Sequence, residues 1–422
     1  MPISDQTSRW FSRFGYQPPG IVVPEFRPGT RLMVVIPALA EPELDRTLQS
    51  LHSATLPGFP IDILVVVNHP EGATPGIIQQ SQANLTTCKA WEHRWQNHDL
   101  RLITIHAPDL PSRHAGAGLS RKIGLDLAVL MADGLANHQV ILANLDADCT
   151  VSDNYFISLS QHFATGAPDG ASLYFEHDLS LAEDGLHRQS IIEYELYLRY
   201  YIRGLRFAGY PFAFHTVGSS MAVTMETYLG SGGMNRRKAG EDFYFLHKII
   251  PNGRFTDLTS ATVFPSPRPS WRVPFGTGRT ISNRLETGST DYQVYSPAIF
   301  KELRSWISGI HENGLNPLWW NEWEHHAPPS IATFLIRQNF SLRLTTIFNN
   351  SSTPGAALQG FWRWMDGFAM LKLVHHLRDE EHGTTSVEHA AFELLNLTGK
   401  TACSGTGPLL SLYRALDKAA EW

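Results

Sequence analysis

Short apolar runs alternate with helical patterns along the first third of the chain. Four runs are rich in β-branched and other apolar residues and have the length of strands; they cover residues 31–37, 61–68, 101–107 and 139–147. Between them, apolar residues recur at helical spacing, in segments 41–51, 76–95 and 116–132. Strands that alternate with such helices predict βαβ crossovers and a mainly parallel sheet covered on both faces. We therefore expect an α/β fold whose ligands bind at the carboxyl ends of the strands.

The last third of the chain has a different pattern. Four segments space their apolar residues as helices do, and they lie at 298–314, 330–348, 360–383 and 386–397. This pattern favours a mostly α-helical region packed beside the sheet domain. We predict three parts: an N-terminal extension at 1–30, the α/β domain at 31–284 and the helical region at 285–422.

Composition is that of an ordinary globular protein. Of 422 residues, 43% are hydrophobic and 18% are charged, and a formal net charge of -6 disfavours a general nucleic-acid-binding surface. The three cysteines, Cys88, Cys149 and Cys403, lie far apart and suggest neither a disulfide framework nor a zinc cluster. The N-terminus lacks a signal-peptide core, and no apolar run reaches the ~18 residues of a membrane helix. We expect a cytoplasmic protein with no nucleic-acid partner and no integral membrane segment.

Two carboxylates follow the fourth predicted strand. Residues i and i+2 of an extended segment point the same way, so Asp146 and Asp148 should converge on one spot. Like charges repel there unless a positive group lies between them. The pair is a candidate seat for Mg²⁺ or Mn²⁺, which commonly bind one or two carboxylates together with substrate phosphates. A general acid/base couple and a chance pair of surface charges are the alternatives.

A second acidic pair, Glu241 and Asp242, opens a predicted helix at 241–250. It follows a glycine-rich and basic segment, 230–238. Acidic residues in the first turn are favoured by the helix dipole, so helix stabilisation alone is one explanation. The other is a general base that removes a proton from an attacking hydroxyl group.

The order of these motifs resembles that of a family 2 glycosyltransferase with the GT-A fold. The segments that carry the resemblance span 31–279 and read "VVIPALAEPELDRTLQSL", "ILVVVN", "GAGLSRKIGLDLA", "NLDADCTVSDNYF" and "VGSSMAVTMETYLGSGGMNRRKAGEDFYF". The resemblance implies a GT-A domain, which is Rossmann-like, has a mainly parallel sheet with flanking helices, and binds a nucleotide sugar. The chain departs from the usual opening of the family, because "ALAE" follows the first proline.

Site residues follow from the resemblance. It implies that Asp148 binds the divalent cation directly and that Asp146 lies near the ribose or the metal. It also implies a nucleotide site lined by Pro37, Ala38, Glu41 and Asn68. The catalytic base would be Asp242, the aspartate of the E-D pair, with Glu241 in contact with acceptor or donor.

The helix at 116–132 has two interpretations. Gly116 and Gly118 open it as in a dinucleotide-binding fingerprint, but the next glycine, Gly124, comes too late for G-x-G-x-x-G. The glycosyltransferase resemblance implies that its N-terminus and Arg121 or Lys122 face the diphosphate, where helix dipole and cation oppose the phosphate charge. A solvated helix face would explain both cations equally well.

A proline-rich and arginine-rich segment at 265–279 predicts a loop. Its arginines, Arg268, Arg272 and Arg279, could close over a diphosphate, because guanidinium binds phosphate with two hydrogen bonds. The alternative is a surface loop with solvated arginines.

Together these patterns predict an enzyme. We expect a glycosyltransferase that depends on Mn²⁺ or Mg²⁺ and moves a sugar from a nucleoside-diphosphate sugar to an acceptor hydroxyl, on a sugar or small molecule, with inversion. A sugar nucleotidyltransferase and a catalytically silent nucleotide-sugar-binding protein are the alternatives.

Overall fold

The computed structural model describes residues 4–96, 99–133, 140–269, 277–287, 292–314, 316–401 and 403–421. Its contacts divide the chain into two compact units. The sheet unit consists of Met1–Ala182 and Thr216–Asn283, and the helical unit of Glu183–His215 and Arg284–Trp422. Residues 183–215 therefore belong to the helical unit, although they lie within the range 31–284 that the sequence suggested for the α/β domain.

An eight-stranded sheet forms the core of the sheet unit, in the order β3-β2-β1-β4-β7-β6-β8-β5. The strands are β1 (Leu32–Leu39), β2 (Ile61–Pro70), β3 (Leu100–Leu110), β4 (Ile141–Asn144), β5 (Thr150–Val151), β6 (Gly170–Phe175), β7 (Met221–Thr224) and β8 (Phe255–Phe264). β1 to β4 pair in parallel, and so do β6 and β8, whereas β7 is antiparallel to both of its neighbours and β5 to β8. The predicted α/β class with a mainly parallel sheet is confirmed.

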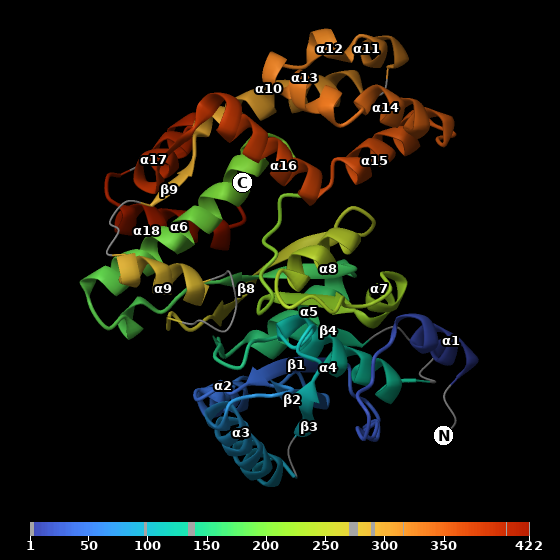
Figure 1. Ribbon diagram of the computed structural model, residues 1–422, viewed down its shortest axis with the longest axis vertical. Helices are drawn as coiled ribbons and strands as arrows, with labels where there is room; N and C mark the ends of the chain where they lie inside the picture. Colours follow the sequence, from blue (N-terminus) through green and yellow to red (C-terminus); the bar gives the residue numbers. More distant parts are fainter. Residues whose placement is uncertain are drawn as a thin grey trace. The chain divides into compact units, whose positions relative to one another are not determined.

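Helices cover both faces of the parallel half of the sheet (Figure 1). The helices of the sheet unit are α1 (Asp5–Phe14), α2 (Leu44–Ser53), α3 (Pro75–Arg94), α4 (Ala117–Met131), α5 (Tyr155–Gly166), α7 (Met225–Gly230) and α8 (Glu241–Ile249). α4 packs directly on the sheet, because a Cβ on Gly124 would collide with Val35 and lie 3.1 Å from Val66. On β3, Thr104 bonds to Glu92 of α3 and is in register with Val65 of β2. Successive residues of a strand face opposite sides of the sheet, so Val65 and Thr104 face away from Val66, and α3 covers the face opposite to α4.

The helical unit confirms the predicted mostly α-helical part. Its elements are α6 (Gly185–Phe207), α10 (Pro297–Asn313), α11 (Pro317–Asn321), α12 (Trp323–His326), α13 (Pro329–Arg337), α14 (Phe340–Asn349), α15 (Pro354–Trp364), α16 (Gly367–Leu377), α17 (Val387–Leu397) and α18 (Thr406–Lys418), with a hairpin of β9 (Gln293–Tyr295) and β10 (Thr384–Ser386). The pattern at 330–348 is two helices, because Asn339 adopts a left-handed φ of 53° between them. Among the described residues, no helix is both long and apolar enough to span a membrane.

Candidate functional site

The parallel strands bring the polar motifs to one edge of the sheet. β1, β2 and β4 run in parallel and end at Leu39, Pro70 and Asn144. The D-x-D segment begins two residues after β4, whose last residue pairs with Val35 of β1. This edge is where open α/β sheets bind their ligands.

Asp146, Asp148 and Cys149 form a compact cluster, in which one ligand atom from each lies within 4.8 Å of the others. A turn sets this geometry, because the Cys149 amide donates to the Asp146 carbonyl at 3.0 Å. Burial, with the charges of Asp148 and Asp146, holds the pKa of the Cys149 thiol well above its ordinary value, so the thiol is neutral. The two carboxylates are therefore the oxygen donors, and such a set fits a hard divalent cation that also binds phosphate.

Arg121 of α4 is the positive group between Asp146 and Glu241. Its side chain is 4% exposed and forms ion pairs with Asp146 and with Glu241. Gly218 lies against the guanidinium group: a Cβ at this position would be 2.6 Å from Arg121 Nη2. The D-x-D motif and the E-D pair, far apart in the sequence, are thus joined through one buried cation.

Asp242 lies in the same group. Burial raises the pKa of its carboxyl group, and Asp146 adds to the increase, while the positive charge of Arg121 and the amides of Phe243 and Gly218 oppose it. The Phe243 amide donates to Asp242 Oδ1 at 2.8 Å, at the start of α8. A carboxylate held in this way is a stronger base than an exposed aspartate.

Lys122 has different surroundings from Arg121. Its ammonium group lies 2.8 Å from Asp126 Oδ2, and both side chains are almost completely buried. Asp126 also accepts from the Tyr228 hydroxyl at 2.6 Å and from the Tyr16 amide at 2.7 Å. Adjacent helix residues point about 100° apart, which explains why only one of the two cations is beside the carboxylates. Neither one belongs to a solvated helix face.

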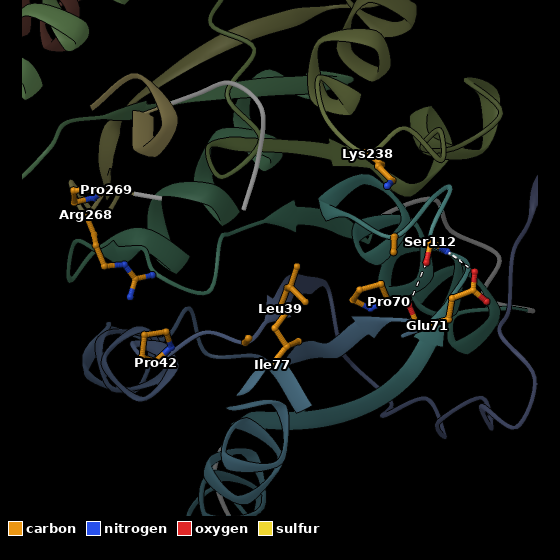
Figure 2. Close-up of a pocket in the computed structure, with 11 residues that line it drawn as sticks. Leu39, Pro42, Pro70, Glu71, Ile77, Ser112, Lys238, Arg268 and Pro269 are labelled. Atoms are coloured by element: carbon orange, nitrogen blue, oxygen red, sulfur yellow. Dashed lines mark hydrogen bonds between the residues drawn. The ribbon is translucent and has the colours of Figure 1, made fainter. Parts of the chain in front are cut away.

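A pocket of about 580 Å³ opens at the same edge of the sheet. Its lining comes from the ends of β1 and β2, the segments that follow β1, β2 and β3, the start of α3, and two segments that carry the cations Lys238 and Arg268. The lining residues are Leu39, Ala40, Pro42, Pro70, Glu71, Ile77, Ser112, Ala115, Lys238, Arg268 and Pro269. Figure 2 shows Arg268 and Lys238 on opposite sides of Leu39 and Ile77. An apolar floor between two cations suits a ligand with a flat ring and negative charge.

The sequence-predicted nucleotide residues lie at or next to this pocket. Arg268 Nη2 donates to both carboxylate oxygens of Glu41, at 2.9 and 3.0 Å. Pro37 and Ala38 lie within β1, and the two residues after them line the pocket. Asn68 is 1% exposed, and its amide group donates to the Val66 carbonyl at 3.1 Å.

The predicted arginine loop is only partly a loop. Residues 265–269 have no regular structure. Arg279, in contrast, lies in helix α9 (Thr277–Thr287), which begins at the TGR segment. Arg272 lies outside the described residues.

Close packing explains the glycines that open α4. A Cβ on Gly116 would lie 2.7 Å from the Lys238 carbonyl oxygen, and one on Gly118 would lie 2.8 Å from the Glu241 Cβ. These glycines let the segment before α8 approach the N-terminus of α4, so their role in the structure is packing. No local pattern in the sequence indicates that Gly218 packs on Arg121, because this contact depends on the tertiary fold.

The chain is similar to solved glycosyltransferase structures, at low scores. No family model and no curated protein matches the sequence. S. aureus TarS 1–349 in complex with UDP-GlcNAc is 12% identical over 88% of this chain and 93% of that chain, with a TM-score of 0.39, and its UDP complex gives 0.36 at the same identity and coverage. GalNAc-T7 with UDP, GalNAc and Mn²⁺ is 16% identical over 57% of this chain and 45% of that chain, with a TM-score of 0.35. Likeness at this level establishes neither the family nor the activity of the chain.

Proposed function

We propose that the chain is a GT-A type glycosyltransferase that moves a sugar from a nucleoside-diphosphate sugar to an acceptor hydroxyl, with inversion. One observation carries the proposal: Asp146, Glu241 and Asp242 meet around Arg121 at the carboxyl edge of the sheet. The order of the sequence motifs, which resembles that of family 2 enzymes, supports the same activity.

The donor occupies the pocket at the ends of β1 and β2. Its base packs on the apolar floor formed by Leu39 and Ile77, and its diphosphate extends toward Lys238, three residues before the acidic pair. Arg268, on the other side of the floor, is held by its bidentate pair with Glu41. The acceptor is a sugar or a small molecule with a free hydroxyl group, and no nucleic acid takes part.

Asp146 and Asp148 would hold Mn²⁺ or Mg²⁺ together with the diphosphate. When bound, such a cation neutralises charge that develops on the leaving diphosphate. Arg121, which is buried against Asp146, adds a fixed positive charge beside the proposed cation site. Fixed charges in a buried site stabilise a developing charge without reorganisation.

Asp242 is the general base. It removes the proton of the acceptor hydroxyl as that oxygen bonds to the anomeric carbon, while the bond from this carbon to the diphosphate breaks. The raised pKa of its carboxyl group makes proton transfer more favourable than for an exposed aspartate. Glu241 keeps Arg121 in place. Attack from the face opposite the leaving group inverts the anomeric centre.

The test is transfer from a panel of UDP- and GDP-sugars in Mn²⁺, with release of the nucleoside diphosphate as the readout. Asp242→Asn should lower the rate about 10²- to 10⁴-fold, the usual contribution of a general base. Glu226→Gln is the matched control, because Glu226 also lies in the first turn of a helix, α7, and is exposed. Equal rates in wild type and Asp242→Asn would contradict the assigned base, and no donor consumption would contradict the activity.

A further inference from the structure

The segment that ends at the E-D pair has an unusual backbone. Residues 231–240, the 231–240 loop, connect α7 to α8 and end immediately before Glu241. Gly232, Gly233 and Gly240 adopt left-handed φ values of 73°, 72° and 69°. Glycine adopts such angles without steric cost, but it also leaves the loop free to adopt others. Neighbouring elements must therefore fix its position.

The N-terminal segment lies directly on this loop. A Cβ on Gly232 would be 3.2 Å from the Phe14 ring, and one on Gly233 would be 3.2 Å from the Trp10 ring. The Trp10 indole donates to the Leu229 carbonyl at 2.8 Å, at the end of α7. Two aromatic rings of α1 thus pack against the backbone of Gly232 and Gly233.

The next residues of the N-terminal segment extend the contact. The Arg236 guanidinium lies 4.5 Å from the centre of the Tyr16 ring, a cation–π distance. The Tyr16 amide donates to Asp126, the same buried carboxylate that pairs with Lys122. The N-terminal segment is therefore anchored both to α4 and to the loop.

On its other side, the loop rests on the start of α4. The Arg236 carbonyl bonds to the His114 ring at 3.2 Å, and Gly116 packs on the Lys238 backbone. Asn235 Nδ2 donates to the Glu241 carbonyl at 3.1 Å, which links the loop to the first residue of α8. The loop is thus held between α1 and α4. It includes Lys238 of the pocket and ends immediately before the acidic pair.

We propose that Trp10, Phe14 and Tyr16 are positioning residues of the site: they fix the 231–240 loop, and through it Glu241 and Asp242, although none of them touches the carboxylates. The effect on catalysis rests on the proposed function. The role of the three aromatic residues in fixing the loop does not depend on that function. A displacement of about 1 Å at a catalytic group can cost ~10²-fold in rate, so weak contacts outside the site have a large effect.

The experiment is hydrogen exchange of the full-length chain without ligand, followed by transfer kinetics. Trp10→Ala should speed exchange of the Ser231, Gly232 and Gly233 amides, which bond back to α7, by about tenfold, because one hydrogen bond and its packing are lost. It should also lower kcat. Trp10→Phe, which keeps a ring but loses the donor, should have a smaller effect of the same kind and serves if Trp10→Ala does not fold.

Trp91→Phe is the matched control, because the Trp91 indole also donates one hydrogen bond of 2.8 Å in the sheet unit, to Asp45. It should leave loop exchange and kcat unchanged. Unchanged loop exchange in the Trp10 variants, or equal changes in Trp91→Phe, would overturn the proposal. If the Trp10 variants show faster loop exchange but the wild-type protein transfers no sugar, the positioning of the loop is supported and the proposed function is refuted.

Discussion

Gly218→Ala is a minimal change that should displace Arg121. The added methyl group would lie 2.6, 2.7 and 2.8 Å from Nη2, Cζ and Nη1 of the guanidinium group. Gly218 is not among the glycines with positive φ, so alanine fits the backbone and the effect is steric. To reach ordinary contact at 3.4 Å, the guanidinium group must retreat by about 0.8 Å.

This retreat should weaken the pairs of Arg121 with Asp146 and Glu241 together. Forcing an extra methyl group into a packed site costs about 1–3 kcal/mol of stability, and a displacement of this size in a catalytic group costs about 10- to 100-fold in rate. The assays are chemical denaturation and transfer kinetics on the best donor. We expect a fall in kcat that exceeds any change in KM, because the donor pocket does not include Gly218.

Gly76→Ala is the control for a glycine substitution in the same unit. A Cβ at Gly76 in α3 meets nothing within 4 Å, so the rate should not change, and stability should stay equal or rise by up to ~1 kcal/mol. A wild-type rate in Gly218→Ala would refute the reasoning that the position of Arg121 organises the carboxylates.

Two more outcomes test the buried charges. The pKa of Asp242 is raised in the folded state, so ionisation of this carboxyl group destabilises the folded chain. Above the folded-state pKa, Asp242→Asn should therefore be more stable than wild type, by ~1.4 kcal/mol for each pKa unit of the shift. The difference should vanish as the pH falls toward the ordinary value of 3.8, which denaturation at pH 7.5 and pH 4 can check. Lys122→Met leaves Asp126 buried without its cation and should cost about 3–5 kcal/mol, whereas Lys301→Met, whose pair with Glu393 is partly exposed, should cost less than ~1 kcal/mol by the same measurement.

The parallel half of the sheet could be predicted from the sequence, and the antiparallel half could not. β1 and β2 are buried on both faces, so they read as continuous apolar runs. β7 has four residues between small and turn-forming ones, too few to show a period. In the helical unit, buried ion pairs such as Arg199 with Glu195 and Asp417 give α6 charged residues in its core, which an apolar pattern does not reveal.

For the site, the sequence identified the acidic motifs but not how they are joined. The D-x-D and E-D pairs could be recognised because the first follows a predicted strand and the second opens a predicted helix. That Arg121 contacts both, while Lys122 contacts Asp126, depends on how α4 is rotated against the sheet. The close approach of Gly218 to Arg121 is likewise a tertiary contact without a local signal.

The most direct test of the central claim is a thermal-shift panel of UDP, GDP, UDP-glucose, GDP-mannose, UTP and GTP, each with Mn²⁺ or with EDTA, on wild type and Asp148→Ala. A ligand at about 100 times its dissociation constant stabilises the folded state by ~2.7 kcal/mol, which such an assay detects. The account predicts stabilisation by one nucleoside diphosphate and its sugar that requires Mn²⁺ and is lost in Asp148→Ala. No shift with any nucleotide, in a folded protein, would contradict it.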